Sequence, residues 1–293
     1  MANKRFLDFT TDETPSGSSF ILEADSVNGV RKTTIEKAVA ATDAFANINN
    51  KVTDVFYNNY IAHNGIYRGK DITSYFESGQ MSADIANNNW DNIYIGDYIV
   101  KTVSTATATY ENVRWHVAAI TPHINKGDVA TSVYHVLMIS HEVLQKDVAM
   151  NQTASTNGGY LGSDMWNVVM PIWATAIKNA FGSDHILRHR ELLVDAVSWQ
   201  WVDVDVNIPN ESMVFGAKIF GNSGFNVGDF STQLPLFAYL QNINYLDTYS
   251  GYWLRSVASD VEFVVVSANG SPRPGDANSH SNTIGIRPYF LLK

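Results

Sequence analysis

The sequence predicts an α+β fold with two main helices and a larger number of short strands. Residues 33–47 and 165–181 have the apolar spacing of helices. Around them lie many short runs rich in β-branched and aromatic residues, separated by Gly, Asn, Asp and Ser, and such runs are typical of strands. Two helices flanked by many short strands indicate an α+β arrangement.

Composition limits the possible functions. The chain has 293 residues, enough for one large domain or two modest ones. Its formal net charge is -9 and its basic residues are scattered, so we expect no nucleic-acid partner. The absence of cysteine excludes disulfides, thiolate nucleophiles and thiolate metal sites. Residues 1–20 lack the apolar segment of a signal peptide, and no stretch is apolar and long enough to insert into a membrane.

Residues 1–50 are expected to form an arm and a helix for attachment or trimerisation, and residues 51–293 a separate domain. Up to about residue 30, short apolar runs alternate with polar residues and are too small to form a core. In 33–47, Thr33 or Thr34 can cap a helix whose small apolar residues share one face. Such a face suits packing between subunits, and packing within one subunit is an equal alternative.

The remaining elements are expected in the following order. Residues 71–87 predict two short helices around Gly79, with Asp71 as an N-cap candidate. Residues 153–164 have the composition of a loop, and the helix 165–181 is expected to kink at Pro171. Strands are expected at residues 90–100, 102–110, 113–120, 131–139, 199–208 and 213–219.

The C-terminal stretch, residues 251–293, has two apolar ends and a polar middle. Residues 252–254, 261–266 and 284–292 predict buried strands. Residues 267–283 contain no aliphatic side chain larger than Ala, no Phe, Tyr or Trp, and two prolines. We interpret them as an exposed loop that the buried strands on either side hold in place. A solvated loop without a partner is the alternative, although Asn, Ser, Arg and His are also typical of adaptable recognition surfaces.

From Asp71 onward, the chain resembles a family of phage- and prophage-encoded proteins. The resemblance rests on four stretches: DITSYFESGQMSADIANNNWDNIYIGDYI at 71–99, MNQTASTNGGYLGSDM at 150–165, AFGSDHILRHRELL at 180–193, and the pair YWLRSVAS and GIRPYFLL near the C-terminus. The family has a C-type-lectin-like domain, similar to the formylglycine-generating-enzyme fold. It includes phage tail receptor-binding proteins and tropism determinants.

This resemblance implies two helices around a small twisted antiparallel sheet, a homotrimer, and a ligand-binding face made by the C-terminal loops. Trp253, Arg255, Gly285, Arg287 and Pro288 would be framework, with Trp253 in the core. Some relatives diversify this face by a retroelement, for which the chain is a candidate. The implied ligand-contact residues are Tyr252, Ser259, Asp260, Asn269, Ser271, Arg273, Asp276, Asn278, His280 and Asn282.

Catalytic and metal chemistry have weaker support in the sequence. The oxidation carried out by formylglycine-generating relatives needs cysteines, which the chain lacks. The strings Ile208-Pro209-Asn210-Glu211 and Trp90-Asp91-Asn92 do not fit the calcium motifs of sugar-binding lectins.

Two pairs of residues could still suggest such chemistry. His185 and His189 could share a metal if their segment were helical, but no third ligand is in register. Asp203 and Asp205 could form a carboxylate pair, although a solvated strand face explains them better. We therefore expect no catalytic residue, no metal, no cofactor and no enzymatic activity.

The sequence thus predicts a virion-associated receptor-binding protein of a phage tail or fibre, made in the host cytoplasm. Its partners would be a host cell-surface glycan or protein and other tail or capsid proteins of the virion. The alternative is a structural virion component, such as a head fibre, decoration or baseplate protein, that binds no receptor. A carbohydrate-active enzyme is a third and weaker reading.

Overall fold

A computed structural model describes residues 20–25, 29–34, 60–195, 198–221, 232–239 and 250–293. The chain divides into two compact units, residues 1–56 and 57–293, where we had expected a boundary after residue 50. In the first unit, β1 (Phe20–Asp25) and β2 (Gly29–Thr34) form an antiparallel hairpin, with Phe20 paired to Thr34. Thr33 and Thr34, the expected helix cap, therefore lie in a strand, and the rest of the expected helix 33–47 lies outside the described residues.

The second unit is built on an antiparallel five-stranded sheet in the order β3-β4-β5-β13-β8. Its strands are β3 (Tyr98–Ser104), β4 (Thr109–Ile120), β5 (Val136–Ser140), β13 (Tyr289–Leu292) and β8 (Val206–Asn207). β5 and β13 pair from Val136–Leu292 to Ile139–Tyr289, and both are buried throughout. A strand that is covered on both faces typically has a nearly continuous run of apolar residues, and the sequences of β5 and β13 have this pattern.

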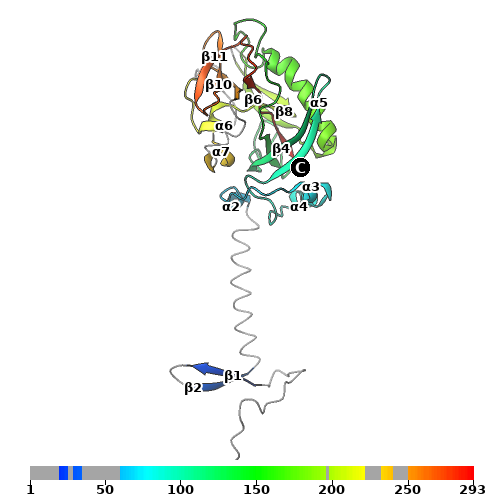
Figure 1. Cartoon of the computed structure of the whole chain (residues 1–293), viewed down its shortest axis with the longest axis vertical. Coiled ribbons are helices and arrows are strands. Elements are labelled where there is room, and N and C mark those ends of the chain that lie inside the picture. Colours follow the sequence, from blue (N-terminus) through cyan, green and yellow to red (C-terminus); the bar gives the residue numbers. More distant parts are fainter. Residues whose placement is uncertain (1–19, 26–28, 35–59, 196–197, 222–231, 240–249) are drawn as a thin grey trace, which may run out of the picture. The chain divides into compact units, whose positions relative to one another are not determined.

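One long helical segment packs on this sheet (Figure 1). It begins as a π-helix, η2 (Met165–Val169), and continues as α5 (Met170–Phe181). Pro171 is the second residue of α5 and follows the π-helical turn directly. Because Pro has no N–H, it cannot continue the hydrogen-bond ladder from that turn. At the place where a kink was expected, the segment changes from π-helix to α-helix. The Phe181 ring lies 4.8 Å from that of Phe290 of β13, centroid to centroid, and joins the helix to the sheet.

Three short helices lie together at one end of the second unit, close to its first described residues (Figure 1). These are α2 (Tyr60–His63), α3 (Thr73–Glu77) and α4 (Gln80–Ala86). The predicted pair around Gly79 is confirmed, and Gly79 adopts a φ of 76°, which favours glycine. Asp71 was the expected N-cap, but the N-cap residue of α3 is Ile72; Asp71, one residue earlier, accepts hydrogen bonds through Oδ1 from the backbone N–H and hydroxyl of Thr73.

A second sheet has the order β11-β10-β9-β12 and carries the C-terminal surface. Its strands are β9 (Gly251–Val257), β10 (Glu262–Val266), β11 (Pro272–Asp276) and β12 (Ile284–Gly285), and β12 is parallel to β9. A separate hairpin pairs β6 (His189–Val194) with β7 (Trp199–Val204). With mostly antiparallel sheets and few helices, the described part of the chain is α+β, as the sequence predicts.

Several sequence-based boundaries were wrong. Residues 90–97 form no strand: β3 begins at Tyr98, and the preceding turns are held by the Asp97 carboxylate, which accepts the backbone N–H of Lys70 and Tyr94. The strand expected at 213–219 is a helix, α6 (Glu211–Phe215), because the Asn210 side chain caps it by accepting the N–H of Met213. Helix α7 (Pro235–Tyr239) follows further along the chain, and residues 240–249 lie outside the described residues.

Candidate functional site

Strand β9 forms the buried frame of the C-terminal surface. All of its residues are buried, and Trp253 is fully enclosed, which confirms its predicted place in the core. The Trp253 indole Nε1 donates to the carbonyl of Val148 at 2.7 Å. Gly275 of β11 lies over the same ring, and a Cβ on Gly275 would come within 3.2 Å of it. Strand β11 therefore rests directly on the core.

The polar middle of the C-terminal stretch is only partly a loop. Residues 272–276 form β11, which pairs antiparallel with β10 from Val266–Pro272 to Glu262–Asp276. The backbone N–H of Ala277 donates to the carbonyl of Val261, so the amides of alternate residues, Arg273 and Gly275, also face β10. Pro272 and Pro274 then have their nitrogens on the outer edge, where no ladder hydrogen bond is lost. This is why a segment with two prolines can be an edge strand.

The hairpin of β10 and β11 separates the predicted contact residues into two groups. Asn269 and Ser271 lie at its turn. Asp276 lies in the last pair at the opposite end, the base, and Asp260 and Asn278 lie just beyond that pair. Four residue steps along a strand span about 13 Å. A small ligand at the base therefore does not reach the turn.

The base of the hairpin is joined to the loop of residues 151–157. The backbone N–H of Asn151 donates to the carbonyl of Ala277 at 2.9 Å, and that of Thr156 donates to the carbonyl of Asp260 at 2.9 Å. The Thr156 hydroxyl donates to the carbonyl of Ser259. We call the surface made by the 151–157 loop with Asp260, Asp276 and Asn278 the hairpin-base surface.

The predicted contact residues differ in what their side chains do. Three of them hold loops: Asn269 accepts from the Ser271 N–H, Ser259 donates to Glu262, and His280 Nδ1 lies 3.1 Å from the carbonyl of Asp147. Arg273 reaches only the neighbouring carbonyl of Pro274. Among the predicted contact residues, the exposed side chains that make no hydrogen bond or ion pair to the protein are those of Asp260, Ser271, Asp276, Asn278 and Asn282.

Tyr252 is corrected to a framework residue. It is 1% exposed, and its ring lies under the guanidinium of Arg287, 5.2 Å from the Arg287 Cζ. Burial raises the pKa of Tyr252 to about 12. A phenol enclosed in this way cannot meet a partner at the surface, because β9 places its side chain inside the core.

A polar cleft beside the hairpin-base surface was not predicted. It has a volume of about 220 Å³ and is lined by Asn151, Gln152, Thr153, Ser155, Asn157, Gly162 and Asp164. The signal in the sequence is the dense run of amide and hydroxyl side chains in this loop, which lies far from the C-terminus along the chain. The cleft therefore extends the candidate site beyond the C-terminal residues.

Arg255 belongs to a buried network that supports the frame. The Glu191 carboxylate accepts hydrogen bonds from Arg255, His189 and Asn207, and also from the Tyr289 hydroxyl. Burial alone would raise the pKa of the Glu191 carboxyl, but the guanidinium of Arg255 and the imidazole of His189 hold it well below its usual range. The network ties β6 to β9 and β13.

The other candidate residues have structural surroundings. His185 lies in a 3-10 turn and His189 starts β6, so the pair does not share a helical face. Asp203 and Asp205 are not a carboxylate pair on one strand, because β7 ends at Val204. Asp205 is bound by Lys178 and Arg188 at 2.6 and 2.7 Å, and the Arg188 hydrogen bond, opposed by partial burial, lowers its pKa to about 2.

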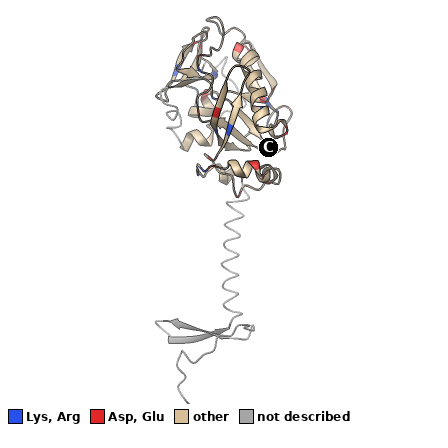
Figure 2. Cartoon of the chain, turned by 45° about the vertical axis from the view of Figure 1, so that its right-hand side comes forward, with Lys and Arg blue, Asp and Glu red and all other residues tan. Residues whose placement is uncertain are grey.

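No protein-family model, curated protein or solved structure matches the chain. In the part of the chain that the structure describes, no helix has the length and apolar character needed to cross a membrane. Figure 2 shows basic and acidic residues dispersed over the second unit rather than gathered into one patch of a single sign.

Proposed function

We propose that the chain is a virion-associated receptor-binding protein with a C-type-lectin-like domain. Its hairpin-base surface would contact a glycan or protein on the host cell. The observation that carries this proposal is the contrast between a fully buried frame, β9 and β13, and the exposed polar side chains that it holds. A rigid scaffold that presents loops is the usual arrangement of binding sites.

The composition of this surface favours recognition by hydrogen bonding. Gln152 and Asn157 are exposed amides in the wall of the polar cleft, and Asp276 and Asn278 are exposed at the base of the hairpin that the same loop contacts. Each such contact is weak, so useful affinity would come from several copies of the domain acting together. The proposed homotrimer supplies such copies.

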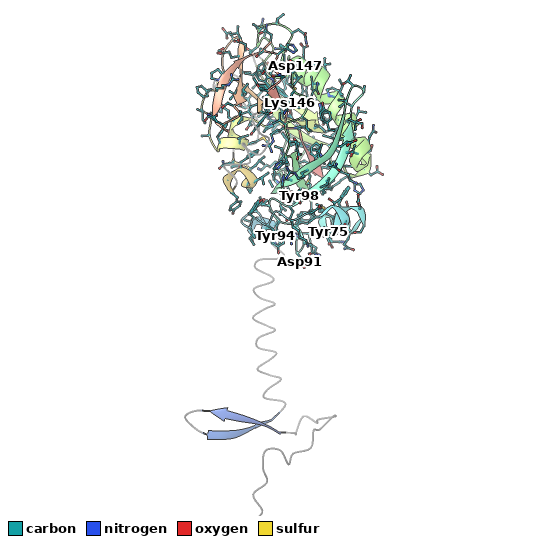
Figure 3. The ribbon with its side chains drawn as sticks, viewed as in Figure 1. Tyr75, Asp91, Tyr94, Tyr98, Lys146 and Asp147 are labelled. Carbon is teal, nitrogen blue, oxygen red and sulfur yellow. The ribbon has the colours of Figure 1, made fainter. Side chains whose placement is uncertain are left out.

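The position of the surface supports the same proposal. Within the second unit, β10 and β11 lie at the end away from α2, α3 and α4 (Figure 1). Figure 3 shows Lys146 and Asp147 near that end and Asp91 and Tyr94 at the opposite one. The unit begins near α2, so the candidate surface is displayed away from the point where the chain enters.

The test is binding of the purified full chain to host cells. A variant with Gln152, Asn157, Asp276 and Asn278 changed to Ala removes exposed groups and leaves the frame intact. A matched control changes Ser74, Glu77, Asn87 and Asp91, exposed residues at the other end, to Ala. We expect the first variant to lose most cell binding and the second to retain it.

Equal binding by the two variants would reject this surface as the receptor site. Two results together would instead favour the structural virion component: the purified chain binds no cells, and virus particles that lack the chain still adsorb normally. Changing Asn269 and Ser271 to Ala separately asks whether the turn of the hairpin contributes.

A further inference from the structure

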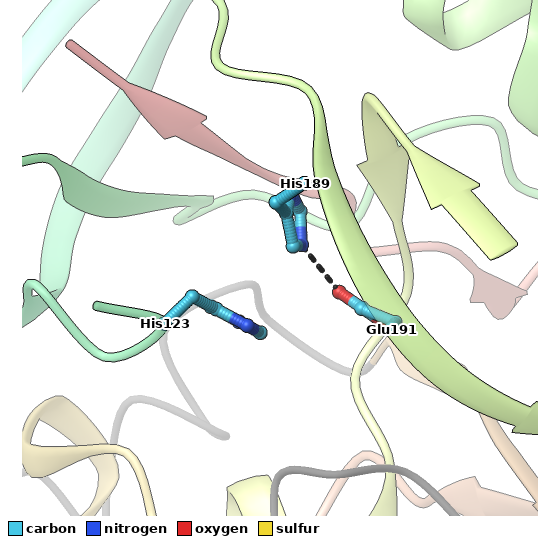
Figure 4. Close-up of side chains that lie close together, drawn as sticks. All are labelled: His123, His189 and Glu191. Carbon is cyan, nitrogen blue, oxygen red and sulfur yellow. Dashed lines mark hydrogen bonds and ion pairs between the residues drawn. The ribbon is translucent and has the colours of Figure 1, made fainter. Parts of the chain in front are cut away.

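Three metal-ligating side chains converge inside the second unit, away from the hairpin-base surface. His123 lies in the turn after β4, and His189 and Glu191 lie two residues apart on β6, which places them on one face of the strand. All three are buried, and one ligand atom of each lies within 4.8 Å of the other two. Figure 4 shows the side chains pointing toward one another.

The donor set suits a divalent transition-metal ion. Two imidazoles and one carboxylate are a known combination for Zn²⁺, and the chain has no thiolate to compete. The Glu191 carboxylate supplies negative charge.

The surroundings orient these groups as second-shell residues do in metal sites. Oε2 of Glu191 accepts from Asn207 and Arg255, whereas the other oxygen, Oε1, accepts from the Tyr289 hydroxyl and lies 2.7 Å from His189 Nε2. The backbone N–H of His123 donates to Nε2 of His135, which anchors the turn that carries His123. The Glu191 carboxylate and the backbone of the turn that carries His123 are therefore fixed in position without a bound ion.

His189 is the member of the cluster that reaches a cavity, of about 540 Å³, although its side chain is only 1% exposed. The charged residues in the cavity wall are Arg188, Arg190 and Asp203, and Arg190 pairs with Asp203 at 3.2 Å. The Asp203 carboxylate is thus already neutralised, and an ion reaches the buried donors only when this wall opens locally.

We propose that His123, His189 and Glu191 bind one divalent transition-metal ion, with Zn²⁺ the best suited. Ligands around a tetrahedral Zn²⁺ stand about 3.3 Å apart. His189 Nε2 and Glu191 Oε1 must separate slightly, and the His123 ring must move inward. The ion replaces the hydrogen bond between His189 Nε2 and Glu191, and the single proton of a neutral His189 ring then sits on Nδ1, which lies 3.4 Å from the carbonyl of Leu187. The bound ion joins the turn after β4 to β6 and so stabilises the domain.

The experiment uses the full chain and Zn²⁺ alone. The chain is stripped with EDTA, incubated with ZnCl₂ and separated from free metal by gel filtration, and retained zinc is measured by mass spectrometry. We expect about one ion per chain and a rise in Tm of about 5 °C. The His123→Asn variant is expected to lose both effects, whereas the exposed-site control His280→Asn keeps them.

Zinc retention that is equal in the wild type and in His123→Asn would overturn the proposal, as would a wild type that retains none. If His123→Asn does not fold, Co²⁺ added to the wild type decides. The strong visible absorption of tetrahedral Co²⁺ supports the buried site, and the weak absorption of octahedral Co²⁺ rejects it. Zinc retention, Tm and Co²⁺ absorption are all measured without cells, so a failure of the metal proposal is distinguishable from a failure of the receptor-binding proposal.

Discussion

Glu191 and Arg255 form a charge pair that is buried almost completely, with side-chain exposures of 0% and 2%. Two such charges lose their hydration on folding, and the loss is tolerated only while both partners remain. The Glu191→Gln variant keeps the shape and leaves Arg255 without its compensating charge. We expect the free energy of unfolding to fall by about 3–5 kcal/mol in urea denaturation with EDTA present.

The matched control is Glu77→Gln. Glu77 pairs with Lys101 at 3.2 Å, but its side chain is 56% exposed, so the loss should stay below about 1 kcal/mol. Similar losses for the two variants would contradict the role of burial at Glu191.

A pair of buried histidines predicts acid sensitivity. His116 Nδ1 lies 2.7 Å from the carbonyl of Gly96, and its Nε2 lies 2.9 Å from His141 Nδ1. Burial lowers the pKa of His116 to about 4 and that of His141 to about 3. In the unfolded chain both take up protons near pH 6.5, so the unfolded state binds more protons below that pH and stability falls as pH drops toward 4.

We expect each of these histidines to cost about 1 kcal/mol of unfolding free energy between pH 7.5 and 5.5. His135, whose pKa burial lowers to about 4, adds to the slope. Carboxylates with lowered pKa, such as Asp205, act only at lower pH, so this window isolates the histidines. His141→Gln should reduce the pH slope in urea titrations. A stability that does not change across the window would refute the assignment.

At the scale of elements, β12 depends on a close backbone approach. A Cβ on Gly285 would lie 2.3 Å from the carbonyl oxygen of Leu144, and that carbonyl accepts the N–H of Ile286 at 2.8 Å. We expect Gly285→Ala to lower the free energy of unfolding by about 1–3 kcal/mol, because the extra methyl pushes two backbone segments apart. Gly65→Ala, whose nearest contact would be at 3.1 Å, is the milder control. Equal stability of the two variants in thermal unfolding would show that the backbone around β12 accommodates the methyl group without cost, which contradicts the prediction.

The element scale also shows how far sequence patterns extend. The paired helices around Gly79 and the buried strands β9, β10 and β13 follow from local signals: a glycine turn and continuous apolar runs. Local sequence patterns gave the wrong element in two places. Residues 213–219 alternate like a strand, but the cap at Asn210 starts a helix there. Residues 272–276 contain two prolines, which indicated a loop, but they form the edge strand β11. Edge position is a property of the assembled sheet, so residues 272–276 could not reveal it alone.

At the scale of the molecule, the division into two units predicts separate roles: oligomerisation by residues 1–56 and ligand binding by residues 57–293. If residues 1–56 hold the subunits together, a chain reduced to residues 57–293 should be monomeric and still unfold cooperatively. The full chain should sediment as the proposed trimer in analytical ultracentrifugation. A trimer from the shortened chain would move the oligomer contacts into the second unit.

The sequence by itself determined the α+β class, the buried C-terminal strands and the largely exposed polar character of residues 267–283. These follow from local composition and periodicity, which act over a few residues. Only the tertiary structure decided that Tyr252 is enclosed, that the 151–157 loop completes the hairpin-base surface, and that His123 meets His189 and Glu191. These features depend on contacts between segments far apart in the chain, which are formed when two sheets and a helix pack around one core.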